Sequence, residues 1–127
     1  MTWTSDILER ISRADELALS SDRPDGSSRP FITMWAVVVR GELFVRSAHG
    51  PGNGWYRRAL ASGSGLIRAG GAQAAVTFGD GSDADQAAID AEYHRKYDRY
   101  GARIVGSVVG SAAHAVTVRI EPAEATP

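Results

Sequence analysis

Apolar residues recur along this chain with two different periods. Near the start, Ile7, Leu8 and Ile11 follow helical spacing, and Ser5 can cap the short helix that they predict. Further along, alternating or continuous apolar residues are typical of β-strands. The predicted strands span residues 16–20, 31–39, 42–47, 65–69, 73–78 and 113–120.

Turn-forming residues connect several of these strands directly. Arg40-Gly41 and Gly70-Gly71 each lie between two neighbouring strands, where glycine supplies a positive φ at little steric cost, so both predict tight hairpins. The run 31–39 is apolar at every position but one and needs cover on both faces, which a closed barrel provides. Residues 104–111 are apolar with glycine interruptions and fit either a strand or a loop.

Two more helices are predicted, at residues 54–62 and at about 84–100. Ser82 or Asp83 can cap the longer one, and Gly101 is placed to stop it. About six strands joined mostly by hairpins, with no repeated strand–helix–strand alternation, predict an α+β fold. We expect an antiparallel barrel or roll with two or three attached helices.

Composition limits the classes of protein that fit. With 127 residues, 43% hydrophobic and 23% charged, we expect one globular domain over residues 1–127, with 121–127 as a flexible tail. The net charge is −1 and no cluster of Lys and Arg offsets it, which argues against a nucleic-acid partner. The start lacks a signal-peptide pattern and no apolar run is long enough to span a bilayer, so we expect a cytoplasmic protein with no membrane partner.

The absence of cysteine excludes disulfides, thiolate nucleophiles and cysteine-ligated metals. His49, His94 and His114 lie far apart in the sequence and lack the spacing of a helical pair of metal ligands. We therefore expect no metal site.

The segment from residue 43 to residue 60 carries the clearest chemical signal. A strand leads into a glycine-rich bend and then into a helix, an arrangement in which backbone N–H groups can approach an anion. Arg57 and Arg58 fall in the first helical turn, where the helix dipole disfavours cations. A bound phosphate or carboxylate would relieve that conflict; the alternative is that both side chains extend into water.

Aromatic and basic residues elsewhere have both a structural and a functional interpretation. Trp55 and Tyr56 either stack on a planar ligand or anchor the helix, and Trp35 is either core or a pocket wall. Arg68 interrupts an apolar strand, so a buried position would require an anionic partner such as a carboxylate or a phosphate.

The predicted long helix carries Tyr93, Tyr97 and Tyr100 on one face. Packing explains this stripe, although Tyr97 could instead donate a proton to a substrate. His49 beside the glycines is a better functional candidate than His114, which falls on the apolar side of the last predicted strand.

Several motifs resemble those of a small bacterial family of unknown function. They are Leu43-Phe44-Val45-Arg46-Ser47, Gly50, Trp55-Tyr56, Gly65-Leu66-Ile67-Arg68-Ala69-Gly70-Gly71, Val76-Thr77-Phe78 and Tyr93-His94-Arg95-Lys96-Tyr97. Over about residues 17–120, the order of elements is also similar to that of the flavin and deazaflavin split-barrel proteins, relatives of pyridoxamine-phosphate oxidases and deazaflavin-dependent nitroreductases.

This resemblance implies an antiparallel split β-barrel, a homodimer, and FMN or a deazaflavin bound at the subunit interface. In the deazaflavin group the loop between the first two strands is basic; here residues 23–29 occupy that place, but the usual lysine is missing and Asp25 intrudes. The residues expected near the cofactor are Arg46, Ser47, His49, Gly50, Gly54, Trp55, Tyr56, Arg57 and Arg68. The residues expected near a substrate are Trp35, Tyr93 and Tyr97.

The function that the resemblance implies is an oxidoreductase that transfers hydride between this cofactor and a small organic molecule. His49 and Tyr97 are the candidate catalytic residues. One alternative has no cofactor: a small-ligand-binding protein, or a lyase or isomerase on the same barrel with His49 or Tyr97 as acid–base group. A non-enzymatic interaction module is a third possibility.

Overall fold

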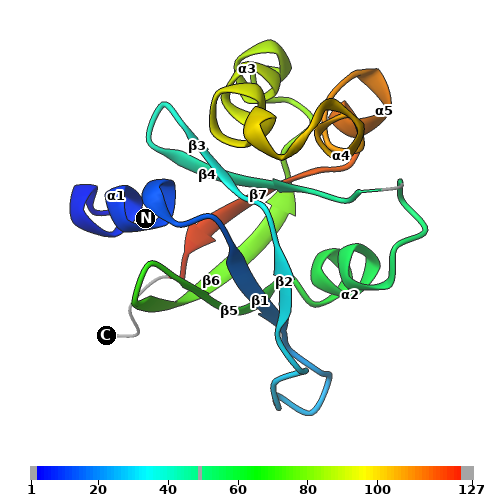
Figure 1. Cartoon of the computed structure of the whole chain (residues 1–127). Coiled ribbons are helices and arrows are strands. Elements are labelled where there is room, and N and C mark those ends of the chain that lie inside the picture. The colour runs from blue at the N-terminus through cyan, green and yellow to red at the C-terminus, as the bar shows by residue number, and fades with distance from the viewer. Residues whose placement is uncertain (1–2, 49, 124–127) are drawn as a thin grey trace.

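The centre of the molecule is a strongly curled antiparallel β-sheet (Figure 1). The computed structural model describes residues 3–48 and 50–123. The sheet has seven strands in the order β2-β1-β5-β6-β7-β4-β3, which makes the chain an α+β protein with a curled half-barrel. The strands are β1 (Leu17–Ser21), β2 (Ile32–Met34), β3 (Val37–Val39), β4 (Glu42–Arg46), β5 (Ser64–Ala69), β6 (Ala72–Asp80) and β7 (Thr117–Pro122).

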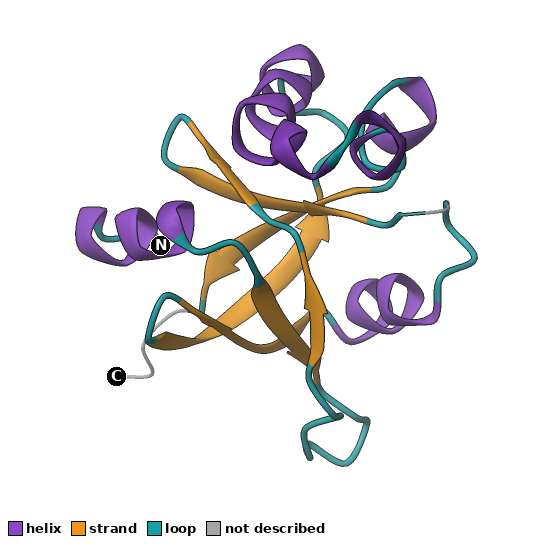
Figure 2. Cartoon of the chain, in the orientation of Figure 1, coloured by secondary structure: helices purple, strands orange, loops and turns teal. Residues whose placement is uncertain are grey.

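Helices gather at separate places around this sheet (Figure 2). They are α1 (Ser5–Arg13), α2 (Gly54–Ser62), α3 (Gln86–Tyr97), α4 (Ala102–Val105) and α5 (Ser111–His114), with a 3₁₀ turn at Asp98–Tyr100. The last three α-helices lie together beside β3 and β4, whereas α2 lies apart from them (Figure 1). The described part of the chain thus holds more helices than the two or three predicted, and none is long and apolar enough to cross a membrane.

The predicted strand 31–39 is wrong as a single element. Trp35 and Ala36 interrupt it, so that β2 pairs with β1 at one edge of the sheet while β3 pairs with β4 at the other edge. The Ala36 amide donates to the Tyr97 hydroxyl (3.1 Å), and its carbonyl accepts from Lys96 Nζ (2.8 Å). Helix α3 therefore binds the backbone groups that become unpaired where the run changes its partner strand.

Both predicted hairpins are confirmed. Arg40 (φ 51°) and Gly41 (φ 78°) join β3 to β4, and Gly70 (φ 58°) and Gly71 (φ 79°) join β5 to β6. Two successive positive φ values are typical of the turn whose twist matches that of the strands.

The helix caps differ from the prediction. Thr4, not Ser5, caps α1, because its hydroxyl accepts from the Ile7 amide (3.3 Å). Asp85 caps α3 by accepting from the Ala88 amide (3.0 Å). Ser82 is occupied elsewhere, because its amide and hydroxyl both donate to Asp80.

The C-terminal third also departs from the predicted pattern. Residues 104–111 form neither a strand nor a plain loop, because α4 and the start of α5 lie there and bury Val105 and Val108 against α3. His114 consequently lies in α5 rather than on a strand. Strand β7 continues through Pro122, so the predicted tail is wrong at residues 121 and 122; residues 124–127 lie outside the described residues.

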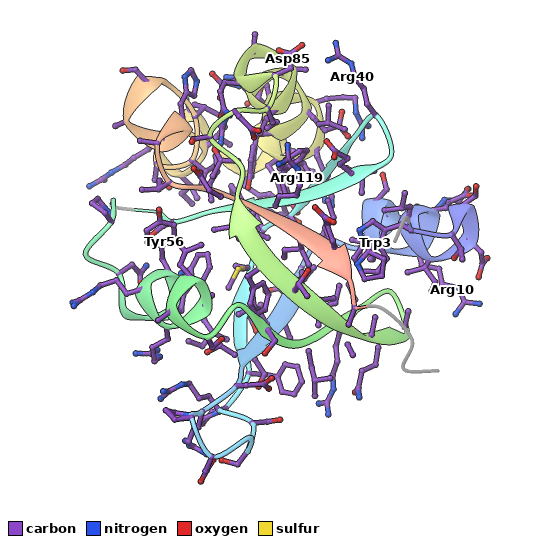
Figure 3. The ribbon with its side chains drawn as sticks, turned by 180° about the vertical axis from the view of Figure 1, so that it is seen from behind. Trp3, Arg10, Arg40, Tyr56, Asp85 and Arg119 are labelled. Atoms are coloured by element: carbon purple, nitrogen blue, oxygen red, sulfur yellow. The ribbon has the colours of Figure 1, made fainter. Side chains whose placement is uncertain are left out.

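Two clusters of buried side chains hold these layers together. One fills the curl of the sheet and includes Leu19, Val45 and Ile67, and the other lies between β3, β4 and α3 and includes Phe44 and Tyr93. Trp3 Nε1 donates to the carbonyl of Ile120 (3.0 Å) beside α1, and Arg40 pairs with Asp85, the N-cap of α3, at 2.9 Å (Figure 3). This arrangement leaves the sheet side of α2 next to open cavities.

Candidate functional site

A cleft runs along α2, between this helix, the loop that joins β1 to β2, and Trp35. It consists of three adjoining cavities of about 210, 490 and 470 Å³ that share lining residues, and we call them together the α2 cleft. Arg58 lines all three cavities, while Trp55 and Ile32 line the first and the third. Volumes of this order are typical of small-molecule sites.

One end of the α2 cleft is strongly basic. Arg23, Arg29 and Arg58 line it, and none of these arginines forms an ion pair with any described residue. Arg23 Nη1 donates to the Ser28 carbonyl (3.1 Å), which holds the arginine against its own loop. Asp22 also lines this end, but its carboxylate accepts from the Ser64 hydroxyl (2.8 Å). Three arginines and one carboxylate among the lining residues leave this end of the cleft with a net positive charge.

The Nε atom of Arg29 is buried and has no hydrogen-bond partner among the described residues. The backbone of Arg29 is fixed, because its amide donates to the Ser21 carbonyl (3.0 Å) and its carbonyl accepts from the Ser20 hydroxyl (2.6 Å). A buried donor without a partner is costly, which makes this atom an indication of a missing acceptor.

The start of α2 lies at the other side of Arg58. Asn53 precedes the helix without a side-chain cap bond in the described structure, and the first turn holds no acidic residue. A Cβ on Gly54 would lie 2.7 Å from Arg58 Nη1, so glycine at this position lets the guanidinium fold back over the helix start. Free N–H groups and a guanidinium thus present positive charge to the same cavity.

The cavity of about 470 Å³ has largely apolar walls. Met34, Trp35 and Trp55 line it together with Ile32, and Ile104 of α4 lines it as well. Trp35 is rigidly held, because its ring stacks on Tyr97 with the centroids 4.2 Å apart and the planes 8° apart. Flat rings beside a basic end suit a planar ligand with an anionic group.

Of the residues expected near a cofactor, the structure brings Gly54, Trp55 and Arg46 to this cleft. Ser47 and Gly50 line a separate cavity of about 300 Å³ beside α4 and α5. His49 lies outside the described residues.

Three further expected residues lie outside the cavities of the α2 cleft, as far as the structure describes them. Arg57 is exposed, and Tyr56 packs against the buried cluster of the sheet. Arg68 is also exposed: its Nε donates to Gln73 Oε1 (2.7 Å), and its guanidinium lies 4.1 Å from the centre of the Phe31 ring. Arg68 therefore does not take the buried position that would have required an anionic partner.

Arg46 lines the cleft, but its side chain is buried and its hydrogen bonds go to other groups of the protein. Its guanidinium pairs with Asp90 and donates to the Val108 carbonyl (2.8 Å) and to Gln86 Oε1 (2.8 Å). Burial of Asp90 opposes its ionisation, but hydrogen bonds from His114 and Arg46 outweigh burial and lower its pKa. This network links β4 to α3 and α5.

Of the residues expected near a substrate, only Trp35 lines the cleft; Tyr93 and Tyr97 are fully buried. The Tyr97 hydroxyl accepts from the Ala36 amide and lies 2.8 Å from the Asp15 carbonyl. Burial raises the pKa of Tyr97 to about 12, and burial also raises the pKa of Tyr93. Neither position is that of a proton donor facing the cleft.

Two arginines of the site were missed from the sequence. The loop arginines Arg23 and Arg29 are absent from the residues expected near a cofactor, because the loop lacks the lysine usual in the resembling group; two arginines on either side of Gly26 are nevertheless a signal. Lys96 does not line these cavities; it is buried on α3, and burial lowers its pKa to about 8. Among the described residues, no group of three acidic or histidine side chains could hold a metal ion.

Comparisons with known proteins agree with this fold. The conserved hypothetical protein Rv2991 from Mycobacterium tuberculosis is 13% identical, with a TM-score of 0.60 over 98% of this chain and 82% of that one. An F420 reductase is 16% identical, with a TM-score of 0.52 over 91% of this chain and 92% of that one. An FAD- and heme-binding protein from Mycobacterium smegmatis is 14% identical, with a TM-score of 0.50 over 97% of this chain and 67% of that one.

At these identities the likeness shows a shared fold, which agrees with the expected antiparallel split β-barrel. No curated protein matches the sequence. Residues 7–120 match the family described as uncharacterized protein conserved in bacteria, DUF2255. The chain therefore belongs to the DUF2255 family.

Proposed function

We propose that the α2 cleft binds a flavin-type cofactor, FMN or a deazaflavin, and that the protein is an oxidoreductase for a small organic substrate. One observation carries the proposal: Arg58, which has no ion-pair partner among the described residues, lies over the start of α2 and beside a cavity walled by Trp35 and Trp55. The solved F420 reductase and FAD- and heme-binding protein, which share the fold at low identity, support the cofactor class.

The residues present fit such a cofactor. A phosphate at the start of α2 would accept from the free N–H groups and from Arg58, which would relieve the repulsion between this arginine and the helix dipole. The apolar cavity next to it has room for a planar ring system against the fixed Trp35 ring.

A bound flavin or deazaflavin supplies hydride transfer, so the protein does not itself need a set of catalytic side chains. The residues of the cleft would bind the cofactor and orient it. Arg58 would fix the anionic end, Trp35 and Trp55 would position the ring, and Met34 and Ile104 would exclude water from the apolar cavity.

We also propose that the protein forms a homodimer that covers the mouth of this cavity. The support comes from Ile104 and Tyr100, whose exposed fractions of 54% and 42% are high for large apolar residues. Ile104 and Trp35 line both the apolar cavity and a neighbouring cavity that reaches Tyr100. A partner subunit there would bury this apolar surface and close the site.

The proposal is tested by titrating the purified protein with FMN and with coenzyme F420 while the visible absorption and the tryptophan fluorescence are recorded. We expect saturable binding at micromolar concentration or below. Arg58→Gln should weaken binding about tenfold or more, because it removes a charge-assisted contact. Arg103→Gln makes the same change of charge at an exposed position of α4 and should leave affinity unchanged.

If neither cofactor binds, the redox proposal fails, and the alternative of a cofactor-free ligand-binding protein or a lyase or isomerase gains support. If binding is unaffected by Arg58→Gln, the anionic group lies elsewhere.

A further inference from the structure

We propose that Asp90 of α3 is a positioning residue for the α2 cleft. Through Arg46 and Gly110 it holds residues 104–110, which we call the wall segment, in place as one side of the apolar cavity. The effect on a cofactor rests on the proposed function. The hold on the wall segment does not, and it can be tested without any cofactor.

The wall segment lies outside the sheet and runs from α4 to the start of α5. Three of its residues, Ile104, Ser107 and Val108, line the apolar cavity of about 470 Å³. The helices α4 and α5 have only four residues each, and helices so short are not stable in isolation. The wall segment therefore depends on contacts with the rest of the molecule for its position.

Arg46 of β4 makes one of these contacts. Its buried Nη1 donates to the Val108 carbonyl (2.8 Å), in the middle of the wall segment. Its Nε donates to the Thr117 hydroxyl (3.0 Å), and its Nη2 donates to Gln86 Oε1 (2.8 Å). With the bond to Asp90, these contacts use four of the five N–H groups of the guanidinium. At most one N–H group is left for a ligand, so the main contribution of Arg46 to the cavity is to hold its wall.

Asp90 holds both Arg46 and the wall segment. Its carboxylate forms the one ion pair of Arg46 among the described residues, and this counter-charge allows the guanidinium to stay buried. The other carboxylate oxygen accepts from the Gly110 amide (3.4 Å) and lies 3.0 Å from His114 Nε2 of α5. One carboxylate thus fixes the middle of the wall segment through Arg46 and its end directly.

A second histidine–aspartate pair provides matched controls. His94 Nδ1 lies 2.8 Å from the Asp98 carboxylate, but the exposed fractions of these side chains are 52% and 58%, against 34% and 24% for His114 and Asp90. Among the described residues, the side chains of the exposed pair form no hydrogen bond to the wall segment. The same substitutions in the two pairs therefore separate the hold on the wall segment from a general change of charge.

Amide hydrogen exchange is the first measurement. Asp90→Asn should speed exchange in the wall segment about tenfold or more, because Arg46 loses its counter-charge and the wall segment then opens locally. Asp98→Asn should leave this exchange unchanged. Ile67→Val lowers the stability of the buried cluster of the sheet without altering the Asp90 contacts, and it should also leave exchange in the wall segment unchanged.

His114→Phe is a second variant, which serves also if Asp90→Asn does not fold. It keeps the buried pair of Arg46 and Asp90 and changes only a half-exposed side chain. Because it removes one of the bonds that fix the Asp90 carboxylate, we expect exchange in the wall segment to rise about threefold or more. His94→Phe should leave it unchanged.

Cofactor titration is the second measurement. Asp90 is not among the described residues that line the α2 cleft, yet Asp90→Asn should raise the dissociation constant of FMN or F420 about fivefold or more. His114→Phe should raise it in the same direction, and Asp98→Asn and His94→Phe should not. The bound cofactor should in turn slow exchange in the wall segment of the unmodified protein, because such coupling is reciprocal.

Unchanged exchange in the wall segment of Asp90→Asn and His114→Phe would overturn the inference, whether or not a cofactor binds. Faster exchange with unchanged cofactor affinity would overturn the positioning role and leave the proposed function intact. If exchange becomes faster as expected but neither cofactor binds to the unmodified protein, Asp90 holds the cavity wall as inferred and the proposed flavin function fails.

Discussion

At the scale of single residues, neighbouring arginines of α2 lie in different surroundings. Arg58 folds back over Gly54 and lines the cleft, whereas Arg57 is exposed, because consecutive helical residues point about 100° apart. The sequence placed both arginines in the first turn but did not distinguish their directions, which depend on where the sheet lies relative to the helix.

We expect Arg57→Gln and Arg58→Gln to differ clearly. Isothermal titration with F420 should give an unchanged dissociation constant for Arg57→Gln and a constant raised about tenfold for Arg58→Gln. Equal effects would mean that charge near the helix start matters and that the position of the guanidinium does not.

Lys96 gives a prediction of pH dependence. Burial lowers its pKa to about 8 from the usual 10.5, with Asp15 and Glu92 opposing this shift and Arg95 and Arg99 adding to it. Between these two pKa values the unfolded chain binds more protons than the folded chain, so the free energy of unfolding should rise with pH.

Over pH 8 to 9.5 this rise should amount to at most about 2 kcal/mol, and it should be missing in Lys96→Met. Urea unfolding at several pH values measures it. Higher pH is avoided because buried tyrosines with raised pKa values then act in the opposite direction. Identical slopes in both proteins would show that the folded pKa of Lys96 is not lowered.

At the scale of elements, close approaches in the sheet fix where glycine is required. A Cβ on Gly65 of β5 would lie 2.0 Å from the backbone carbonyl oxygen of Ser20, and that atom cannot move without disturbing β1. Gly79 of β6 has no described atom within 4 Å of such a Cβ. Gly79 is therefore a control for the same substitution at Gly65.

We expect Gly65→Ala to lower the free energy of unfolding by about 3 kcal/mol or more through overpacking. Gly79→Ala should change it by less than about 1 kcal/mol. Chemical denaturation monitored by tryptophan fluorescence compares them. If Gly65→Ala lowers the free energy of unfolding only slightly, β1 and β5 can move apart at little cost in stability.

Elements that depend on local sequence were predicted well. The two glycine-containing hairpins and the bounds of α2 follow from residues that lie next to one another, so the sequence revealed them. The run 31–39 was misread as one strand because its apolar pattern is continuous, and only the closure of the sheet makes its two halves pair at opposite edges.

At the scale of the whole molecule, the proposed dimer can be tested directly. Sedimentation at micromolar concentration should show a dimer for the unmodified chain and a monomer for Ile104→Glu, because a charge would be buried in the apolar contact. Leu60→Glu, at an exposed apolar residue of α2 with an exposed fraction of 37%, should remain dimeric. A monomeric unmodified protein would contradict the dimer.

The sequence by itself determined the class of fold, the two hairpins and the helix that starts at Gly54, because these depend on local periodicity and on turn residues. Only the tertiary structure decided which basic residues lie together. Arg23, Arg29 and Arg58 are separated by up to 35 positions and meet because β1, β2 and α2 pack around one cleft. The tertiary structure also shows that Arg68 lies outside this cleft and that the Tyr97 ring stacks on Trp35. The curl of the sheet, and not the local sequence, sets which strand and helix faces contact each other.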